Sequence, residues 1–375
     1  MKSEYELSIV IPCLNEEDTL KICLAKIKKV YLDNHLNGEI IVVDNGSTDK
    51  SAYIAKQNGA KVITENIKGY GAALRRGIKE ANGKYILMAD ADDSYDFLDI
   101  MKFLNKIKEG YDLVQGCRLA SGGGTIEKGA MPFSHEKFGN PLFSFLVRFL
   151  YKAPYHDVYC GMRIFKKDTI NKISHFSKGM EFAIENLIKF NANNLKITQV
   201  PIKLYKDGRI NATSHLRTIS DGLRTFKLLL ICCPKWLYFF PSIFFLTLGL
   251  HNILNIYFSD LHDFAIFKEI TISGIFLILS LQIFLCGIFA SLKAEQLGFE
   301  KSNQFIKSFF KFFKLNQLII AFTIIFIFSI IKIKTGLFII YNNEIDLLVS
   351  YFIFYFSVTL LLNSLLVSFL EFEKE

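Results

Sequence analysis

The sequence lacks the patterns of several familiar kinds of site. Its seven cysteines are odd in number and include no C-x-x-C pair, which argues against a zinc site and a disulfide framework and fits reduced cytosolic thiols. No G-x-x-x-x-G-K-[ST] occurs, and the first apolar run leads into PCLNEE instead of G-x-G-x-x-G. A P-loop and a dinucleotide-binding fingerprint are therefore excluded. No signal-peptide pattern precedes residue 7, so we expect the chain to enter a strand directly.

Long apolar stretches are missing up to about residue 230, although 51% of the chain is hydrophobic. Four such stretches follow, at 236–257, 270–290, 316–331 and 347–370. A membrane-spanning helix needs about 20 apolar residues, so the first, second and fourth are long enough. Lys332 and Lys334 could extend the third by snorkelling. Buried core helices are the alternative, but the lengths favour four transmembrane helices after a soluble part.

Basic residues gather beside these stretches. The segment 203–235 holds seven Lys or Arg against two Asp, and the loop between the second and third stretches holds five lysines. The positive-inside rule then predicts that the N-terminal domain, this middle loop and the C-terminus are cytoplasmic. The net charge of +8 comes largely from these flanks, so anionic lipid explains it better than nucleic acid. Residues 214–230 are predicted to form an amphipathic helix at the membrane surface, with an ordinary domain helix as the alternative.

The N-terminal half alternates strand and helix patterns. We expect strands at 6–12, 39–44, 60–65 and 85–90, and helices at 16–32, 50–57 and 71–82. In the first helix Leu20, Leu24 and Ile27 share one face. The alternation predicts βαβ units and a parallel sheet, in which ligands bind beyond the carboxyl ends of the strands.

Polar residues follow each of the four expected strands, and together they predict one site. They are Asn15 and Glu16, then Asp44, Asn45, Gly46 and Ser47, then Asn66 to Gly71, then Asp90 and Asp92. The carboxylate of Asp44 could accept from a nucleobase N–H. Gly69 and Gly71 could let the backbone approach a ligand closely. The cations Lys68, Arg75 and Arg76 could offset the charge of a diphosphate.

The stretch YILMADADDSYD, residues 85–96, brings four aspartates to the end of an apolar strand. Mutual repulsion makes such crowding unfavourable. One interpretation is a solvated turn that caps the next helix, where Asp is common. The other is a divalent cation: Asp90 and Asp92 could turn toward one Mg²⁺ or Mn²⁺, which oxygen ligands select. Such an ion would stabilise a diphosphate as a leaving group.

These motifs resemble family 2 glycosyltransferases with the A-type fold. The resemblance is carried by SIVIPCLNEEDTL, VVDNGSTD, KGYGAALRRGI and the DAD of residues 90–92. Further stretches resemble the polyprenyl-phosphate group, the dolichyl-phosphate mannose and glucose synthases: VQGCR, HDVYCGMRIFKKD, GMEFAIENLIK and VPIKLYKDGR. The resemblance covers about residues 5–235. It implies a Rossmann-like α/β nucleotide-diphospho-sugar transferase domain at 1–210, an amphipathic juxtamembrane region at 211–235 and a four-helix transmembrane domain at 236–375.

The resemblance also implies ligands and residue roles. The donor would be a UDP- or GDP-hexose, with Mg²⁺ or Mn²⁺ as the metal and a dolichyl or undecaprenyl phosphate as the acceptor. The donor would contact Pro12, Asn15, Glu16, Asp44, Asn45, Lys68, Gly69 and Asp90. The metal would be held by Asp90, Asp92 and Ser94, and the acceptor phosphate would contact Arg118, His135, Lys137 and Arg209. The catalytic residues would be Asp92, Arg118 and Arg209. His135 departs from the mannose synthases, which have an arginine there, so its role stays open.

An acceptor that is already an anion needs positioning by cations more than it needs a general base. The Q-x-x-R-W motif of the sugar-polymer synthases is absent, and the one tryptophan, Trp236, stands in CPKWLY. We therefore predict an inverting, membrane-bound glycosyltransferase, which could form a homo-oligomer. A lipid-linked sugar transporter or scaffold with a nucleotide-binding domain is the alternative. Glu185 could contact the sugar, but a structural ion pair with Arg163 or Arg118 is favoured.

Overall fold

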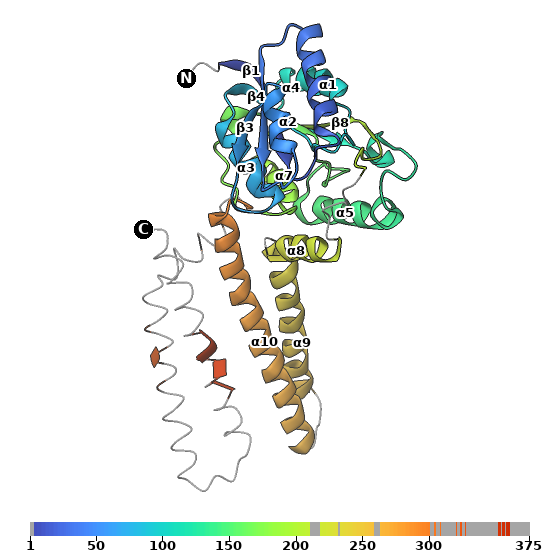
Figure 1. Cartoon of the computed structure of the whole chain (residues 1–375). Coiled ribbons are helices and arrows are strands. Elements are labelled where there is room, and N and C mark those ends of the chain that lie inside the picture. The colour runs from blue at the N-terminus through green and yellow to red at the C-terminus, as the bar shows by residue number, and fades with distance from the viewer. Residues whose placement is uncertain are drawn as a thin grey trace. The chain divides into compact units, whose positions relative to one another are not determined.

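The computed structural model describes residues 4–210, 218–231, 233–258 and 263–300, together with single positions beyond 300. Contacts within the chain separate two compact units, Met1–Leu229 and Leu230–Glu375. We call them the N-terminal unit and the C-terminal unit (Figure 1). The domain boundaries expected at 210 and 235 remain a prediction.

The N-terminal unit is built on a seven-stranded sheet in the order β3-β2-β1-β4-β7-β5-β8, with a second small sheet of β6 and β9. The strands are β1 (Tyr5–Cys13), β2 (Gly38–Asp44), β3 (Lys61–Thr64), β4 (Gly83–Met88), β5 (Leu113–Cys117), β6 (Thr125–Ile126), β7 (Arg163–Lys166), β8 (Ile197–Pro201) and β9 (Lys203–Leu204). The helices are α1 (Leu20–Asp33), α2 (Ser51–Gln57), α3 (Tyr70–Glu80), α4 (Ile100–Lys108), α5 (Asn140–Tyr151), α6 (Lys167–Ile170), α7 (Phe182–Ala192) and α8 (Thr218–Ile231). Short turns of helix lie at η1 (Phe97–Asp99), η2 (Ala120–Gly122) and η3 (His135–Gly139).

The four expected strands and the three expected helices are all present, with ends shifted by a few residues. We expected a parallel sheet, but β7 runs antiparallel to both β4 and β5. The other neighbouring strands, which include β1 between β2 and β4, pair in parallel. The expected α/β sheet is confirmed, with one reversed strand as its correction. Parallel pairing brings the carboxyl ends of β1, β2 and β4 to one edge.

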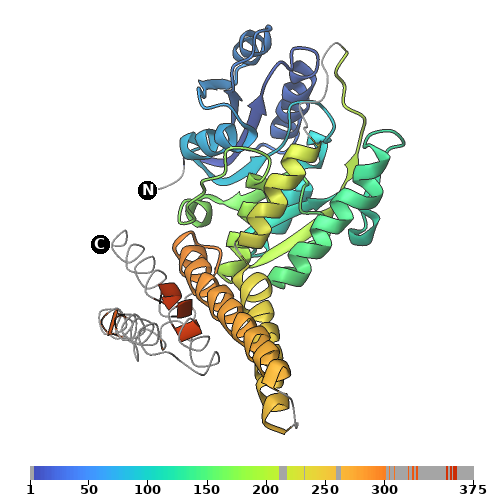
Figure 2. The ribbon, with the colours of Figure 1, turned by 90° about the horizontal axis from the view of Figure 1, so that it is seen from below.

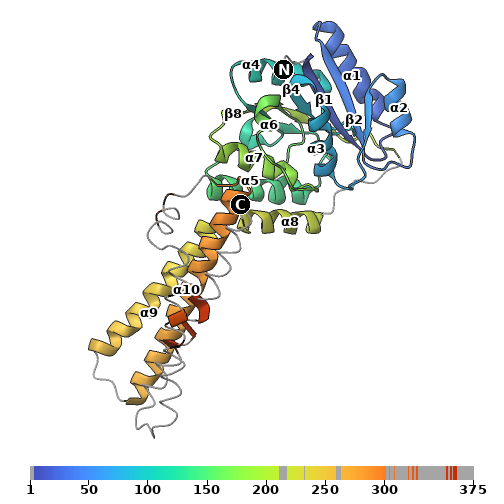
Figure 3. The ribbon, with the colours of Figure 1, turned by 90° about the vertical axis from the view of Figure 1, so that its left-hand side faces the viewer.

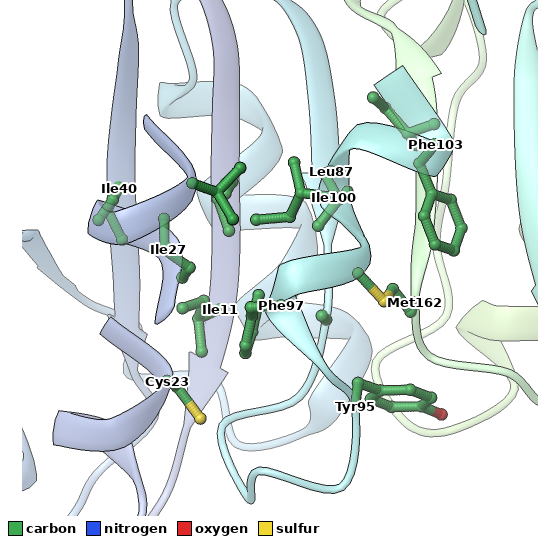
Figure 4. Close-up of a cluster of buried hydrophobic side chains, with 14 of the residues drawn as sticks. Ile11, Cys23, Ile27, Ile40, Leu87, Tyr95, Phe97, Ile100, Phe103 and Met162 are labelled. Carbon is green, nitrogen blue, oxygen red and sulfur yellow. The ribbon is translucent and has the colours of Figure 1, made fainter. Parts of the chain in front are cut away.

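Helices cover both faces of the sheet because alternate side chains of its strands are apolar on each face. On one face α1, α2 and α4 bury a continuous core with β1, whose inward side chains include Leu7, Ile9 and Ile11 (Figure 4). On the other face Gly77 of α3 lies against Val10 and Val43. The helices α2 and α3 flank β2 on opposite sides (Figure 3). This packing fixes the strand ends that carry the polar loops.

The C-terminal unit contains η4 (Lys235–Phe239), α9 (Phe240–Phe258) and α10 (Asp263–Gln296). Two helical stretches, 235–258 and 268–296, are long and apolar enough to cross a membrane by length and composition. Ser242 and Ser280 join them, since each hydroxyl donates to the other residue's backbone oxygen, at 3.0 and 2.8 Å. Gly249 permits a close approach to Leu277. The expected third and fourth spans lie almost wholly outside the described residues, so four spans remain a prediction.

Candidate active site

The loops that follow β1 and β2 are tied to each other. Asn15 has a left-handed backbone, φ 56°, which asparagine tolerates better than most residues. Its N–H donates to the hydroxyl of Ser47 at 3.0 Å, and its Oδ1 accepts from the N–H of Thr48 at 2.8 Å. Asp44 accepts from the N–H of Ser47 at 3.0 Å through one carboxylate oxygen. Pro12, near the end of β1, pairs with Val43 one residue before Asp44. The strand register therefore brings the first donor-side residues to one place.

Asn45 serves the chain's own loops. Its amide donates to the backbone oxygens of Glu65 and Ile67, at 2.8 and 2.9 Å, and its Oδ1 accepts from the N–H of Gly69 at 2.7 Å. Because these contacts use both amide hydrogens, Asn45 holds the loop after β3 in place. Its expected contact with the donor remains a prediction.

The space beside Gly69 and Gly71 is filled by the protein itself. Gly69 has φ 138°, and a Cβ there would lie 2.1 Å from the backbone oxygen of Lys178. At Gly71 a Cβ would meet Phe182 and the backbone oxygen of Ser177, both at 2.7 Å. These glycines therefore leave room for another part of the chain, and the donor contact expected at Gly69 remains a prediction. They admit the segment that leads into α7, which packs against the first turn of α3.

The basic residues near this loop divide into two groups. Lys68 is exposed, and its side chain passes within 4.0 Å of a Cβ built on Gly46, at the loop after β2. Arg75 donates to the backbone oxygen of Phe176 at 3.1 Å, and Arg76 pairs with Glu80 at 3.2 Å on the same helix. Lys68 therefore remains a candidate for a diphosphate, while Arg75 and Arg76 are held by other contacts.

The four aspartates after β4 separate into two pairs with different surroundings. Asp93 pairs with Lys26 at 2.8 Å, and Asp96 accepts from the N–H of Leu98 at 3.1 Å and so caps η1. Asp90 and Asp92 contact neither of these partners. The structural interpretation thus holds for Asp93 and Asp96, and the metal interpretation of Asp90 and Asp92 remains a prediction.

Asp90 lies in a crowded place. Its carboxylate accepts from the hydroxyl of Tyr70 at 2.9 Å, and the backbone of Gly161 lies so close that a Cβ there would be 2.6 Å from it. Burial, followed by the nearby charge of Asp92, raises the pKa of Asp90 to about 7. An added cation would favour the ionised carboxylate. Tyr70 was not predicted as a site residue, although it stands within the KGYGAALRRGI motif.

Asp92, Glu16 and Arg209 form a second cluster beside it. The Nε of Arg209 donates to Glu16 at 3.0 Å, and its Nη2 lies 3.5 Å from the other partner, Asp92. Ser94 donates its hydroxyl to Asp92 at 2.6 Å, as expected for a neighbour of the aspartate pair. Burial raises the pKa of Glu16, while the guanidinium of Arg209 opposes the rise. The guanidinium of Arg209, near the end of this unit in sequence, therefore lies between the carboxylates of Glu16 and Asp92.

Arg118 is buried in a bidentate pair with Asp157, at 2.7 and 2.8 Å. A third nitrogen donates to the hydroxyl of Tyr95 at 3.3 Å, and that hydroxyl also accepts from the N–H of Gly161 at 2.8 Å. Burial opposes the charge, but Asp157 outweighs it and raises the pKa of Arg118. Arg118 is thereby linked through Gly161 to the surroundings of Asp90. The carboxylate of Asp157 offsets part of the charge that an acceptor phosphate would meet.

Glu185 and Arg163 have partners other than the expected ones. Glu185 pairs with Lys189 at 2.7 Å and accepts from the N–H groups of Phe176 and Ser177. Arg163 is fully buried and donates to backbone oxygens of Ala183 and Cys160. The structural interpretation of Glu185 is thus correct, but its partner is Lys189. The pair holds the segment that packs on Gly69 and Gly71.

His135 and Lys137 lie together in η3, which leads into α5. Lys137 is exposed and pairs with Glu136 at 2.6 Å. Their expected part in binding the acceptor phosphate remains a prediction.

The residues present suit the divalent cation that the family resemblance implies. Within the described ranges, no group of three or more His, Cys, Asp or Glu could hold a metal alone. Mg²⁺ is commonly held by one or two carboxylates together with substrate phosphates. The carboxylates of Asp90 and Asp92 would provide such a partial ligand set, since burial and the charge of Asp92 already raise the pKa of Asp90.

Comparisons with known proteins indicate the family of this chain. The model of the family described as glycosyl transferase family 2 matches residues 8–174. The low-salt glycan biosynthesis hexosyltransferase Agl6 of Haloferax volcanii is 37% identical over 63% of this chain, and the match spans 56% of Agl6, little more than half of it. A dolichyl-phosphate hexose transferase of the same organism is 30% identical over 52% of this chain and 82% of its own length.

Among solved structures, glucosyl-3-phosphoglycerate synthase of Mycobacterium tuberculosis, with Mn²⁺ and UDP, is 23% identical. It covers 62% of this chain and 81% of its own, with a TM-score of 0.49, too low to carry an argument about ligands. The match to the Haloferax dolichyl-phosphate hexose transferase covers most of the length of that protein. This chain belongs to glycosyl transferase family 2.

Proposed function

We propose that the protein transfers a hexose from a nucleotide sugar to a polyprenyl phosphate, with inversion at the anomeric carbon. The observation that carries the proposal is the pair Asp90 and Asp92 at the carboxyl end of β4. This pair does not share the structural contacts of Asp93 and Asp96. Arg209 links Asp92 to Glu16, in the loop after β1. The name of the Haloferax relative, a dolichyl-phosphate hexose transferase, supports the acceptor class.

On the donor side, the UDP or GDP part lies along the loops after β1 and β2. One carboxylate oxygen of Asp44 accepts from the N–H of Ser47, and the other is proposed to accept from a nucleobase N–H. Asp90 and Asp92, with the Ser94 hydroxyl donating to Asp92, would hold Mg²⁺ or Mn²⁺, and the ion would offset the charge of the departing diphosphate. Lys68, exposed beside the loop after β2, adds a positive charge for the same diphosphate.

The transfer itself exchanges one bond for another. An oxygen of the acceptor phosphate attacks the anomeric carbon as the bond to the nucleoside diphosphate breaks, and the electron pair leaves with the diphosphate. No proton has to be removed from the acceptor, because a phosphate monoester is mostly ionised at neutral pH (second pKa about 6). Arg118 and Arg209, with His135 and Lys137, are proposed to position that phosphate. Attack from the face opposite the leaving group gives inversion.

Arg209 must then change partners during the reaction. Its guanidinium contacts Glu16 and Asp92, so an acceptor phosphate has to compete with these two carboxylates for Arg209. A cation held by Asp92 would weaken the attraction between that carboxylate and Arg209.

The membrane part of the proposal follows the sequence. The N-terminal domain, 1–210, and both termini are cytoplasmic, residues 211–235 lie at the membrane surface, and 236–375 cross the bilayer four times. Two of these crossings are supported by the helical stretches 235–258 and 268–296. The cytoplasmic side is supported by the positive-inside rule.

A panel assay tests the proposal. The purified full-length protein is given UDP- and GDP-linked radiolabelled hexoses, polyprenyl phosphate and Mg²⁺, and label is counted in the organic phase. We expect one donor to label the lipid and EDTA to stop the reaction. A lipid transporter or scaffold would bind nucleotide without forming a labelled lipid, and that result would overturn the proposal.

A further inference from the structure

The carboxylate of Glu181 stands at the start of α7 with one oxygen that the fold does not use. Its Oε1 accepts from the N–H of Gly179 at 3.2 Å. Its Oε2 is buried and has no hydrogen-bond partner in the part of the chain that the structure describes. Gly179 leaves room for this oxygen, because a Cβ at that position would lie 2.6 Å from it. A buried carboxylate oxygen without a donor is unfavourable, so a ligand that donates hydrogen bonds there would be favoured.

Glu185, one turn further along α7, provides the comparison. Its Oε1 accepts from the N–H of Phe176 at 3.0 Å and pairs with Lys189 at 2.7 Å. Its Oε2 accepts from the N–H of Ser177 at 2.9 Å. The fold thus uses both oxygens of Glu185 but only one oxygen of Glu181. A structural role explains the first carboxylate completely and the second only in part.

Two segments of the chain place Glu181 near Asp90. The first is the start of α3, where a Cβ on Gly71 would lie 2.9 Å from the backbone oxygen of Gly179. Tyr70, directly before Gly71, donates its hydroxyl to Asp90 at 2.9 Å. The backbone that leads into Glu181 therefore packs on the same turn that contacts Asp90.

The second segment contains Tyr159 and Gly161. Burial raises the pKa of the Tyr159 phenol, and the negative charges of Asp221 and Glu181 add to the rise, so this phenol lies within electrostatic reach of Glu181. Two residues further on, the backbone of Gly161 lies so close to Asp90 that a Cβ there would be 2.6 Å from its carboxylate. Both segments beside Glu181 therefore also contact Asp90.

The helices α5 and α8 fix the second of these segments. Phe143 of α5 packs edge-on against Tyr159, at 5.5 Å between ring centroids. The helix α8 lies next to α5 when the unit is seen from below (Figure 2). The hydroxyl of Tyr151, the last residue of α5, donates to the backbone oxygen of Leu229 on α8 at 2.9 Å. The position of Tyr159 is therefore set by helix packing.

Three kinds of reactant would meet at the proposed site: a divalent cation, phosphate groups and a hexose. The cation does not suit Glu181, because no three His, Cys, Asp or Glu of the described ranges are grouped to hold a metal, and Glu181 therefore does not join Asp90 and Asp92. Phosphate groups do not suit it, because like charges repel. The hydroxyls of a hexose do suit it, since they are neutral donors and a carboxylate accepts from them strongly.

We propose that Glu181 binds the hexose of the nucleotide sugar by accepting from its hydroxyls, and that it selects neutral hexoses over hexuronic acids. The residue as a whole is half-buried, and the terminal torsion of a glutamate is soft, so a small rotation would present Oε2 to the sugar. A hexuronic acid brings a second carboxylate, which Glu181 would repel. The inference rests on the proposed function, because it takes the donor to be a nucleotide sugar.

Calorimetry of donor binding tests the inference without turnover. The full-length wild type and Glu181→Gln are titrated in detergent with Mg²⁺ and without lipid phosphate. Glutamine keeps an oxygen for the N–H of Gly179 but loses the negative charge. UDP and GDP are compared first, and the tighter nucleotide is then compared with its neutral hexose form, UDP-glucose or GDP-mannose. Glu65→Gln is the matched control, because Glu65 also accepts from an N–H two residues away, at Ile67, but stands in the loop after β3.

We expect Glu181→Gln to weaken binding of the nucleotide sugar by about tenfold and to leave the Kd of the nucleotide alone unchanged. Glu65→Gln should change neither Kd. Equal weakening of nucleotide and nucleotide sugar would overturn the proposal, because Glu181 would then only support the fold. Unchanged binding of both would overturn it as well. The melting temperature of each variant shows that the fold is kept.

The matching hexuronic acid, UDP-glucuronate or GDP-mannuronate, tests the selection. It should bind the wild type more weakly than the neutral hexose does, and Glu181→Gln should narrow the difference. An unchanged difference would overturn the selection by charge. Because these titrations contain no acceptor, a missing lipid product in the panel assay would count against the proposed function alone, so the two failures are distinguishable.

Discussion

The donor edge and the acceptor side of the N-terminal unit are built in different ways. At the donor edge, short polar side chains in neighbouring loops bind backbone N–H groups, as Asn15 does for Thr48 and Asn45 for Gly69. On the acceptor side, arginines are paired with carboxylates from distant parts of the chain. Arg118 pairs with Asp157, and Arg209 pairs with Glu16 across 193 positions of sequence.

This difference separates two neighbouring carboxylates, Asp90 and Asp92, from two arginines that are each held by a close carboxylate partner. Asp90 and Asp92 repel each other and gain from an added cation. Arg118 and Arg209 have carboxylate partners, so an acceptor phosphate has to compete with Asp157 and Glu16. Changes at the donor edge should therefore act on the chemistry itself, and changes on the acceptor side should act on acceptor affinity.

The largest effect is expected for Asp92→Asn, with Asp93→Asn as its control. Asp92 is proposed to hold the metal, which stabilises the transition state by several kcal/mol, so transfer should fall by about a thousandfold or more. Asp93 faces Lys26 in a partly exposed pair worth about 0–1 kcal/mol, and its substitution should change the rate by less than about fivefold. Initial rates in Mg²⁺ and in Mn²⁺ check both values. Full activity of the wild type in EDTA would remove the metal hypothesis.

A second effect, on stability instead of rate, is expected for Lys189→Met. Glu185 and Lys189 are both buried, and removing one partner leaves a buried charge at a cost of about 3–5 kcal/mol. The melting temperature in detergent should fall by several degrees. Because the pair holds the segment packed on Gly69 and Gly71, the KM for nucleotide sugar should rise with it. An unchanged melting temperature would mean that this pair does not hold the donor loop.

The third prediction is Arg118→Ala, which tests the acceptor side. A buried charge-assisted contact with phosphate contributes about 1.5–3 kcal/mol, so the KM for lipid phosphate should rise about tenfold or more. Asp157→Asn is the companion variant, because it keeps Arg118 but removes its partner. If both variants lower the melting temperature equally and leave the acceptor KM unchanged, Arg118 is only structural. A loss of nucleotide affinity instead would mean that the two sides of the site are reversed.

The smallest effect is expected for Leu223→Asp with Phe226→Asp on α8. Both side chains are exposed, so the fold should tolerate the change. Transfer to long-chain polyprenyl phosphate should fall several-fold, while transfer to a short soluble analogue should change little, because only the long acceptor requires the unit at the membrane surface. Equal loss on both acceptors would assign α8 to the core of the catalytic unit.

The sequence predicts the donor edge well because strand ends and the loops after them are local features. The elements up to residue 90 and the placement of Asp44, Asp90 and Asp92 follow from periodicity and strand order. The partners of Asn45 and Gly69 could not be predicted, since they depend on how the loop after β3 folds back. The antiparallel direction of β7 could not be predicted either, because its four apolar and basic residues could pair in a parallel or an antiparallel direction.

One missed contact did leave a signal in the sequence. Glu185 and Lys189 are four residues apart on a helix, the spacing at which opposite charges meet. Arg118–Asp157 and Arg209–Glu16 have no such signal, because their partners are set by tertiary packing alone. The acceptor side was therefore assigned mainly from the family resemblance, and its roles for His135 and Lys137 stay predictions.

The stereochemistry of the lipid product tests the central claim most directly. The full-length enzyme is incubated with its preferred nucleotide sugar, polyprenyl phosphate and Mg²⁺, and the anomeric configuration of the extracted product is read by proton and phosphorus NMR. Direct attack by the acceptor phosphate predicts a sugar joined through its anomeric carbon to the lipid phosphate, with a configuration opposite to that in the donor. Retained configuration, or label released only as free sugar in water, would contradict direct inverting transfer to a lipid phosphate.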